Sequence, residues 1–186
     1  MKISMSKKLL SMLLVSTGLA AASVAHASDG TITFTGSVIA STCKINGGAG
    51  DLGVALPMVS TTSLAANGNV AGRTPFTLSI TGCTTTEGSP TKIGVVFEAG
   101  ANTNMSTGRL TVDAGTTEKP AAKNVEINVL DNTQSPVKVG SQNQGTPVTI
   151  GTDGTAQLSY FAEYYATDKA TAGVANSKVQ YSLTYQ

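Results

Sequence analysis

Apolar residues recur at every second position in short segments of this chain, and this spacing most constrains its fold. In "TPFTLSITGC" the apolar residues Phe76, Leu78 and Ile80 alternate with threonine or serine, and similar alternation recurs at 125–129, 158–166 and 179–185. This period favours β-strands over helices. Turn signals such as "NGG", "STG" and "TDGT" separate the segments. We therefore expect an all-β, antiparallel sandwich.

Three further segments complete the strand assignment. The run "KIGVVFEA" at 92–99 is apolar almost throughout, as expected of a strand buried on both faces or of a central strand. The segments "PVKVG" and "PVTIG" each predict a short strand, whose leading proline suits a strand start or an edge. Two long loops, 47–73 and 99–109, carry no decisive pattern and could hold short strands or a helical turn.

Residues 1–27 have the three parts of a secretory signal peptide. A start with Lys2, Lys7 and Lys8 precedes the apolar run "LLSMLLVSTGLAAA", and "AHA" supplies small residues before a cleavage point. The run is shorter than the roughly 20 residues of a spanning helix, and no later run approaches that length. We expect a mature chain, residues 28–186, that is exported and not inserted in a membrane.

The composition of the mature chain excludes several classes of function. Three of the 12 lysines and arginines lie in the signal peptide, so the remainder is slightly acidic, and no basic cluster suits nucleic acid. The single histidine, His26, also belongs to the signal peptide. The mature chain therefore lacks the commonest general base and transition-metal ligand. We expect one domain, without a cofactor or a metal.

The two cysteines, Cys43 and Cys83, both lie in the mature chain. Export places them where disulfides form, and a bond between them closes a loop of about 40 residues. Two free thiols are the alternative. A metal site is less favoured, because two thiolates without histidine make a poor zinc cage.

Both ends of the mature chain are apolar. Ile32, Phe34 and Val38 lie within about a dozen residues of Ser28, and the last apolar series reaches Tyr185, one residue before the end. Terminal segments are usually disordered unless they are tied into a fold, and exposed apolar strands promote aggregation. We therefore expect both ends to pair with something.

Several segments together resemble the pilin subunits of the chaperone–usher type, and among them the type 1-like major fimbrial subunits. The similarity is carried by "GTITFTGSVIASTC", by "FTLSITGC" before the second cysteine, and by "VEINVLDNTQSPVKVG", "LSYFAEYYA" and "VQYSLTYQ". That family ends with a penultimate tyrosine and a glycine fourteenth from the end, which are Tyr185 and Gly173 here.

The resemblance implies an incomplete immunoglobulin-like sandwich that lacks its last strand, with a hydrophobic groove beside the C-terminal strand. A periplasmic chaperone lends a strand to the groove, and at the outer-membrane usher the N-terminal extension of the next subunit replaces it. The subunit then supports cell adhesion as part of a surface fimbrium. On this reading residues 28–40 are a donor-strand extension and residues 41–186 a pilin domain.

The resemblance also assigns residues to these roles. The donor strand is carried by Ile32, Phe34, Gly36 and Val38. The groove and assembly strand comprises Gly173, Val179, Tyr181, Leu183, Tyr185 and the terminal carboxylate of Gln186. Gly36 interrupts the apolar series, and either a bulge or flexible spacer, or a shallow pocket opposite it, would account for a glycine there.

Three alternatives remain open at this point. The acids Asp51, Glu98, Glu126 and Glu163 show no paired spacing that predicts an enzyme, and a serine nucleophile would need a lysine base. A secreted monomeric binding module, such as a sugar-binding sandwich, lacks tryptophan, and its tyrosines fall in strand patterns. Within the pilin class, a minor adaptor is the alternative to a major rod subunit.

Overall fold

The computed structural model describes residues 29–40, 43–142 and 144–186, and the chain divides into two units between Val38 and Ile39. The expected signal peptide, residues 1–27, lies outside the described residues. The second unit holds eight strands and two short 3-10 helices: β1 (Lys44–Ile45), η1 (Asn46–Gly48), η2 (Thr61–Leu64), β2 (Val70–Thr81), β3 (Lys92–Phe97), β4 (Leu110–Thr111), β5 (Val125–Leu130), β6 (Val148–Thr149), β7 (Ala156–Ala166) and β8 (Tyr181–Tyr185).

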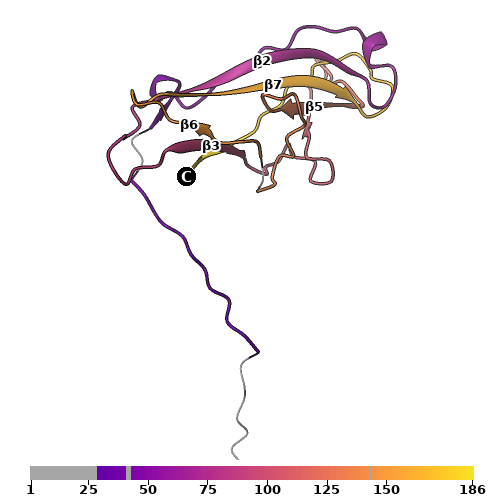
Figure 1. Ribbon diagram of the computed structural model, residues 1–186. Coiled ribbons are helices and arrows are strands. Elements are labelled where there is room, and N and C mark those ends of the chain that lie inside the picture. Colours follow the sequence, from indigo (N-terminus) through magenta and orange to yellow (C-terminus); the bar gives the residue numbers. More distant parts are fainter. Residues whose placement is uncertain (1–28, 41–42, 143) are drawn as a thin grey trace, which may run out of the picture. The chain divides into compact units, whose positions relative to one another are not determined.

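These strands form two antiparallel sheets that pack face to face. The order is β1-β2-β7-β5-β4 in one sheet and β6-β3-β8 in the other, and Figure 1 shows β2, β7 and β5 as a layer above β3 and β6. The shared core takes side chains from both sheets, among them Leu78, Ile93, Phe97, Val129 and Leu158. The expected all-β sandwich is confirmed.

The period-two segments form the long strands for the expected reason. Leu78 and Ile80 of β2 are almost fully buried, while the intervening Ser79 is exposed. β2 pairs with β7 from Val70 to Ile80, so the alternating apolar residues of both strands point into one core. β3 has β6 on one side and β8 on the other, which confirms its prediction as a central strand.

One predicted strand was wrong. The segment "PVKVG" (136–140) forms only an isolated bridge between Pro136 and Leu130, although Val137 and Val139 are buried. The Val137 N–H donates to the carbonyl of Val129 in β5, but the Val139 N–H donates to the carbonyl of Gly108. The segment therefore leaves β5 after two residues. The similar segment "PVTIG" does form β6 along the edge of β3.

The disulfide between Cys43 and Cys83 is present and ties the chain before β1 to the end of β2. That prediction is confirmed. Over the described part of the chain, no helix has the length and apolar character needed to cross a membrane.

The described part of the N-terminal unit, together with the two residues after it, has no secondary structure. Ile32, Phe34 and Val38 are 81%, 91% and 103% exposed. A Cβ added to Gly36 would meet nothing within 4 Å. The apolar side chains of this segment are therefore exposed, and the segment is extended without forming a strand.

A strand-shaped cleft as the candidate functional site

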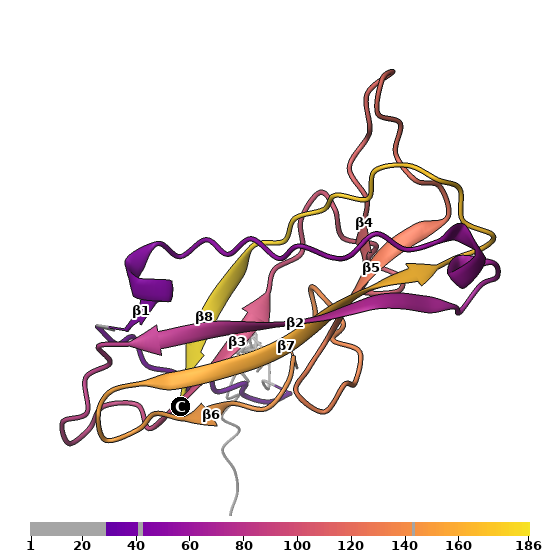
Figure 2. The ribbon, with the colours of Figure 1, turned by 90° about the horizontal axis from the view of Figure 1, so that it is seen from above.

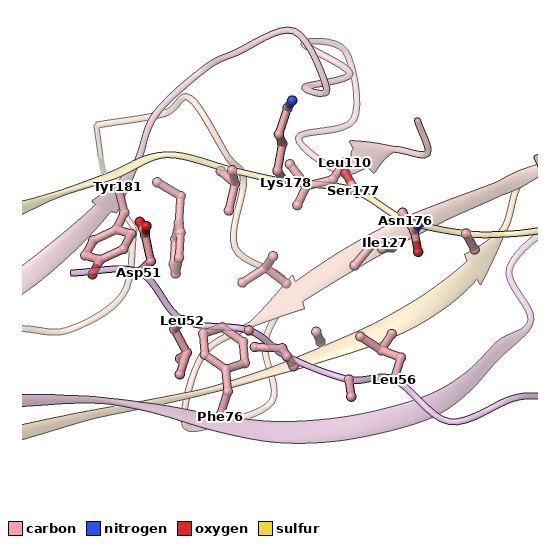
Figure 3. A pocket seen from close by; sticks show the side chains of 18 of the residues that line it. Asp51, Leu52, Leu56, Phe76, Leu110, Ile127, Asn176, Ser177, Lys178 and Tyr181 are labelled. Atoms are coloured by element: carbon pink, nitrogen blue, oxygen red, sulfur yellow. The ribbon is translucent and has the colours of Figure 1, made fainter. Parts of the chain in front are cut away.

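A cleft of about 640 Å³ opens along the second unit, between two extended segments far apart in the sequence. One wall is 51–56, which follows η1, and the other is 175–181, which leads into β8. Figure 2 shows the two segments running along the same side of the sandwich. In Figure 3, Asp51 and Tyr181 lie at one end of the cleft, and Leu56 and Asn176 lie toward the other.

The C-terminal wall turns its even-numbered peptide groups away from the cleft. The carbonyl of Asn176 accepts a hydrogen bond from the Asp113 N–H at 2.7 Å, and that of Gln180 accepts one from Glu98 at 2.8 Å. β8 continues this pattern as the edge strand of its sheet. Because hydrogen-bonding direction alternates along an extended strand, the peptide groups of residues 177, 179 and 181 face the cleft.

The opposite wall is extended but belongs to no sheet. No backbone hydrogen bond joins residues 51–56 to any other part of the chain that the structure describes. Val54 and Leu56 are half-buried, and Leu52 is 42% exposed. The cleft is therefore bordered on both sides by peptide groups available to a strand inserted between them.

The floor of the cleft is apolar and comes from both sheets. β2 contributes Phe76 and Leu78, and the other lining strands contribute Phe97, Leu110, Ile127, Val129, Ala162 and Tyr164. Beneath the floor Tyr160 stacks on Phe76 with ring centroids 5.7 Å apart, and it meets Phe97 edge-on at 5.1 Å. An apolar floor between unpaired peptide groups suits an amphipathic strand.

Polar groups lie along the borders of this cleft. The Tyr181 hydroxyl donates a hydrogen bond to the carbonyl of Gly50, which links the two walls at one end. Burial, with a smaller effect from the charge of Asp51, raises the pKa of Tyr181. The side chains of Asp51 and Lys178 are both seen in Figure 3. The tyrosine is thus a neutral hydrogen-bond donor at neutral pH.

The structure places the predicted groove residues in four different settings. Val179 and Tyr181 line the cleft, whereas Leu183 and Tyr185 pack against the main core beyond its end. Gln186 exchanges backbone hydrogen bonds with Lys92. Gly173 lies outside the cleft, where a Cβ would overlap backbone atoms of residues 120–122.

Sequence reasoning missed the wall at 51–56 and most of the floor. A signal for the wall was present, because Leu52, Val54, Leu56 and Met58 alternate in "DLGVALPM". Gly53 and Pro57 interrupt this series, and both residues weaken a strand prediction. The floor is assembled from strands distant in sequence, so no local pattern identifies it.

The acids considered for catalysis do not form a reactive pair. Glu163 is bound by Arg73 at 2.7 Å, and Glu126 by Arg109 at 3.2 Å, on the side of the sheet away from the cleft floor. Within the described residues, no group of histidine, cysteine and acidic side chains could hold a metal ion. The buried acids are accounted for by structural ion pairs.

The fold and the cleft together define a class of protein: an incomplete immunoglobulin-like sandwich with an apolar cleft between two extended segments. The chain matches the family described as fimbrial protein over residues 32–186, and it belongs to that family. It is a structural fimbrial subunit, a component of surface pili, and its homologues are structural subunits and not enzymes.

Individual relatives agree with this assignment. The chain is 43% identical to the major fimbrial subunit SMF-1 of Stenotrophomonas maltophilia, covering 89% of this chain and 98% of the relative. It is 39% identical to the F17 fimbrial protein of Escherichia coli, covering 90% and 93%.

Solved structures share the fold. The P pilus rod subunit PapA has a TM-score of 0.61 at 21% identity, covering 77% of this chain and 99% of that one. A subunit of a chaperone–usher pilus studied for rod uncoiling also reaches 0.61, at 24% identity, covering 86% and 96%.

Proposed function

We propose that this chain polymerises by donor-strand exchange, with residues 28–40 of one copy completing the sandwich formed by residues 41–186 of another. The observation that carries the proposal is the match between the cleft and the exposed segment. Ile32 to Val38 is seven residues of alternating character, and the wall from Ala175 to Tyr181 is also seven residues. At about 3.3 Å per residue, both span roughly 20 Å.

The energetics support insertion of this segment. Its exposed apolar side chains, Ile32, Phe34 and Val38, would each gain about 1.5–3 kcal/mol on full burial. The peptide groups facing the cleft would gain partners from the inserted strand. Both borders and the floor would then be satisfied by a single segment, and binding would complete the core.

The same cleft explains a need for assembly partners. An apolar slot with free peptide groups is an aggregation hazard during export. A periplasmic chaperone that lends a strand to it, and anchors the carboxylate of Gln186, would protect the assembly strand that includes Gly173, Leu183 and Tyr185. An outer-membrane usher would then exchange that strand for the extension of the next subunit. The name of the 43% identical relative, a major fimbrial subunit, favours a major rod subunit over a minor adaptor. We expect the fimbrium that it builds to support cell adhesion.

Deletion of residues 28–38 tests the proposal. With chaperone and usher co-expressed, we expect electron microscopy to show no fibres from the deleted chain. The purified deleted chain should still bind a synthetic peptide of residues 28–40. A monomeric binding module would stay monomeric and keep its binding after the deletion. Normal fibres from the deleted chain would contradict strand donation.

A pair of double variants refines the test. Replacing Ile32 and Phe34 with serine removes apolar side chains from the donor face and should abolish fibres. Replacing the neighbouring Thr31 and Thr33, which point to the opposite face of an extended strand, with alanine leaves the donor face intact and should preserve fibres. Equal loss in both variants would show that the side-chain alternation of this segment is irrelevant.

A further inference from the structure

The C-terminal wall of the cleft extends beyond the strand that supports it. β3 ends at Phe97, which pairs with Tyr181. The Glu98 N–H still reaches the carbonyl of Gln180 at 2.8 Å, but residues 175–178 lie past that point. This half of the wall therefore depends on another part of the chain for its support.

β4 and the residues that follow it supply the support. The Asp113 N–H donates to the carbonyl of Asn176 at 2.7 Å, and the Ser177 hydroxyl donates to the carbonyl of Thr111 at 2.8 Å. In Figure 3, Asn176 and Ser177 lie at the end of the cleft away from Tyr181. Thr111 and Asp113 thus hold, from behind, the part of the wall that β3 does not reach.

The side chain of Asn102 fixes both of these supporting residues. β4 contains only Leu110 and Thr111, so Asp113 lies beyond its pairing with β5. The Nδ2 of Asn102 donates to the Asp113 Oδ1 at 2.8 Å and to the Thr111 carbonyl at 3.1 Å. Both partners are acceptors, so only the nitrogen of this amide can face them. Asn102 is 8% exposed, and this buried amide therefore connects the loop at 99–109 to the back of the wall.

A second asparagine in the same loop has a different task. The Nδ2 of Asn104 donates to the Glu126 Oε1 at 2.6 Å, on the side of the sheet away from the cleft floor. Neither Asn102 nor Asn104 lines the cleft. The loop therefore offers two similar amides, of which only Asn102 is linked by hydrogen bonds to the residues behind the wall.

An ordered wall favours the uptake of a strand. A strand pairs well only with an extended neighbour, and ordering that neighbour at the moment of binding costs backbone entropy. A wall that is already held extended avoids this cost. Because residues 175–178 have no β3 partner, their order depends on Thr111 and Asp113.

We propose that Asn102 is a positioning residue for strand uptake. Through Thr111 and Asp113 it holds the C-terminal wall in the extended form that an incoming strand requires, without itself lining the cleft. This inference rests on the proposed donor-strand exchange, and it adds to that exchange the residue that prepares one wall before the strand arrives.

Binding of a labelled peptide of residues 28–40 to the full mature chain tests the proposal. The chain is kept dilute enough to remain monomeric, and fluorescence anisotropy follows the binding. We expect Asn102→Ala to weaken peptide binding about three- to tenfold, the factor that corresponds to a hydrogen bond. Asn104→Ala removes a similar bond on the other side of the sheet and should leave the binding nearly unchanged.

Two further measurements separate positioning from a general loss of stability. Urea unfolding of each variant gives the folded fraction to which the binding is referred, and both alanine variants should lower its midpoint. Only Asn102→Ala should accelerate hydrogen exchange at the Asp113 amide, which is bonded to Asn176. A purely structural role for Asn102 would move the unfolding midpoint without changing the binding of the folded protein.

An exchange of side chains provides the rescue. Asn102→Asp places a second carboxylate beside Asp113 and should weaken binding at least as much as alanine does. Adding Asp113→Asn returns an amide donor to this pair and should restore part of the binding, although the bond to the Thr111 carbonyl stays lost.

The outcomes distinguish this role from strand donation itself. Unchanged binding by Asn102→Ala, or an equal loss in Asn104→Ala, would overturn the role of Asn102 and leave donor-strand exchange intact. Failure of the unaltered chain to take up the peptide would overturn both.

Discussion

The side-chain amide of Gln144 pairs with both backbone groups of Phe97 on β3. Its Oε1 accepts the Phe97 N–H at 2.7 Å, and its Nε2 donates to the Phe97 carbonyl at 2.9 Å. Gln144 is 5% exposed and lies on the side of β3 that faces β6, opposite β8. Because β6 contacts only Lys92 and Ile93, this amide acts in place of a neighbouring strand at the far end of β3.

Replacing Gln144 with leucine should therefore remove a hydrogen-bond partner from the backbone of Phe97. The carbonyl still receives the N–H of Gly140 at 3.0 Å, so the N–H of Phe97 is the group left without a partner. We expect a loss of about 1–3 kcal/mol in urea unfolding of the mature chain. Hydrogen exchange at the Phe97 amide should also accelerate. The exposed Gln142, replaced in the same way, is the control, and equal effects of the two variants would argue against this role.

Removing either partner of the ion pair between Arg73 and Glu163 should destabilise the fold, but by different amounts. The Glu163 side chain is 3% exposed and also accepts from Asn128 at 3.1 Å, whereas that of Arg73 is 39% exposed. Arg73→Met leaves the buried Glu163 carboxylate without its ion-pair partner, so it should lower the free energy of unfolding by about 3 kcal/mol. Glu163→Gln leaves an arginine that can reach water, so it should cost less, about 1 kcal/mol. Urea unfolding of the two single variants and the double variant checks the order, and a larger cost for Glu163→Gln would refute it.

The sequence predicts the sandwich because period two is a local property. Parts of β2 and β7 bury alternate side chains, and the apolar residues of β5 alternate in sequence although all six of its residues are buried. Both patterns can be read without knowing the partner strand. The segments at 136–140 and 148–149 look equivalent in sequence. Only the tertiary structure shows that one crosses from Val129 to Gly108, while the other meets the edge of β3.

The sequence predicts one wall of the cleft and not the other, because only one of them continues a recognisable strand pattern. Val179 and Tyr181 continue the strand pattern of the C-terminus, so the sequence identifies them. The wall at 51–56 has no strand partner within its own chain, and its alternation is interrupted by Gly53. The buried role of Gln144 was also hidden, because a polar residue between a glycine and other polar residues resembles an ordinary loop.

A side chain at position 173 should clash with the backbone of residues 120–122, which the C-terminal segment crosses at this point. The Val174 N–H bonds to Pro120 at 2.9 Å, and the Ala122 N–H bonds to Val174 at 2.8 Å. A Cβ on Gly173 would lie 2.5 Å from the carbonyl carbon of Ala121, so Gly173→Ala should separate the two segments. We expect a cost of about 1–3 kcal/mol.

Gly100 supplies the matched control for that variant. A Cβ added there meets nothing within 4 Å, and its backbone is not in the left-handed region. Gly100→Ala should therefore change the urea midpoint little. If Gly173→Ala is equally mild, the close approach of the two segments does not require a glycine.

Tyr160 predicts a loss of stability at alkaline pH. Burial, and then the negative charge of Asp131, raise the pKa of this phenol from 10.0 to about 12. Because the folded state holds the proton more tightly than the unfolded state, the resulting stability is fully present below pH 10 and is lost as the pH rises toward 12. The free energy of unfolding should fall across that window.

The variant Tyr160→Phe keeps an aromatic ring against Phe76 and Phe97 and should make this fall with pH less steep. The fall should not disappear, because burial also raises the pKa of Tyr164. Urea unfolding from pH 9 to 12 measures both profiles, and identical slopes for the two proteins would exclude Tyr160 as the titrating group.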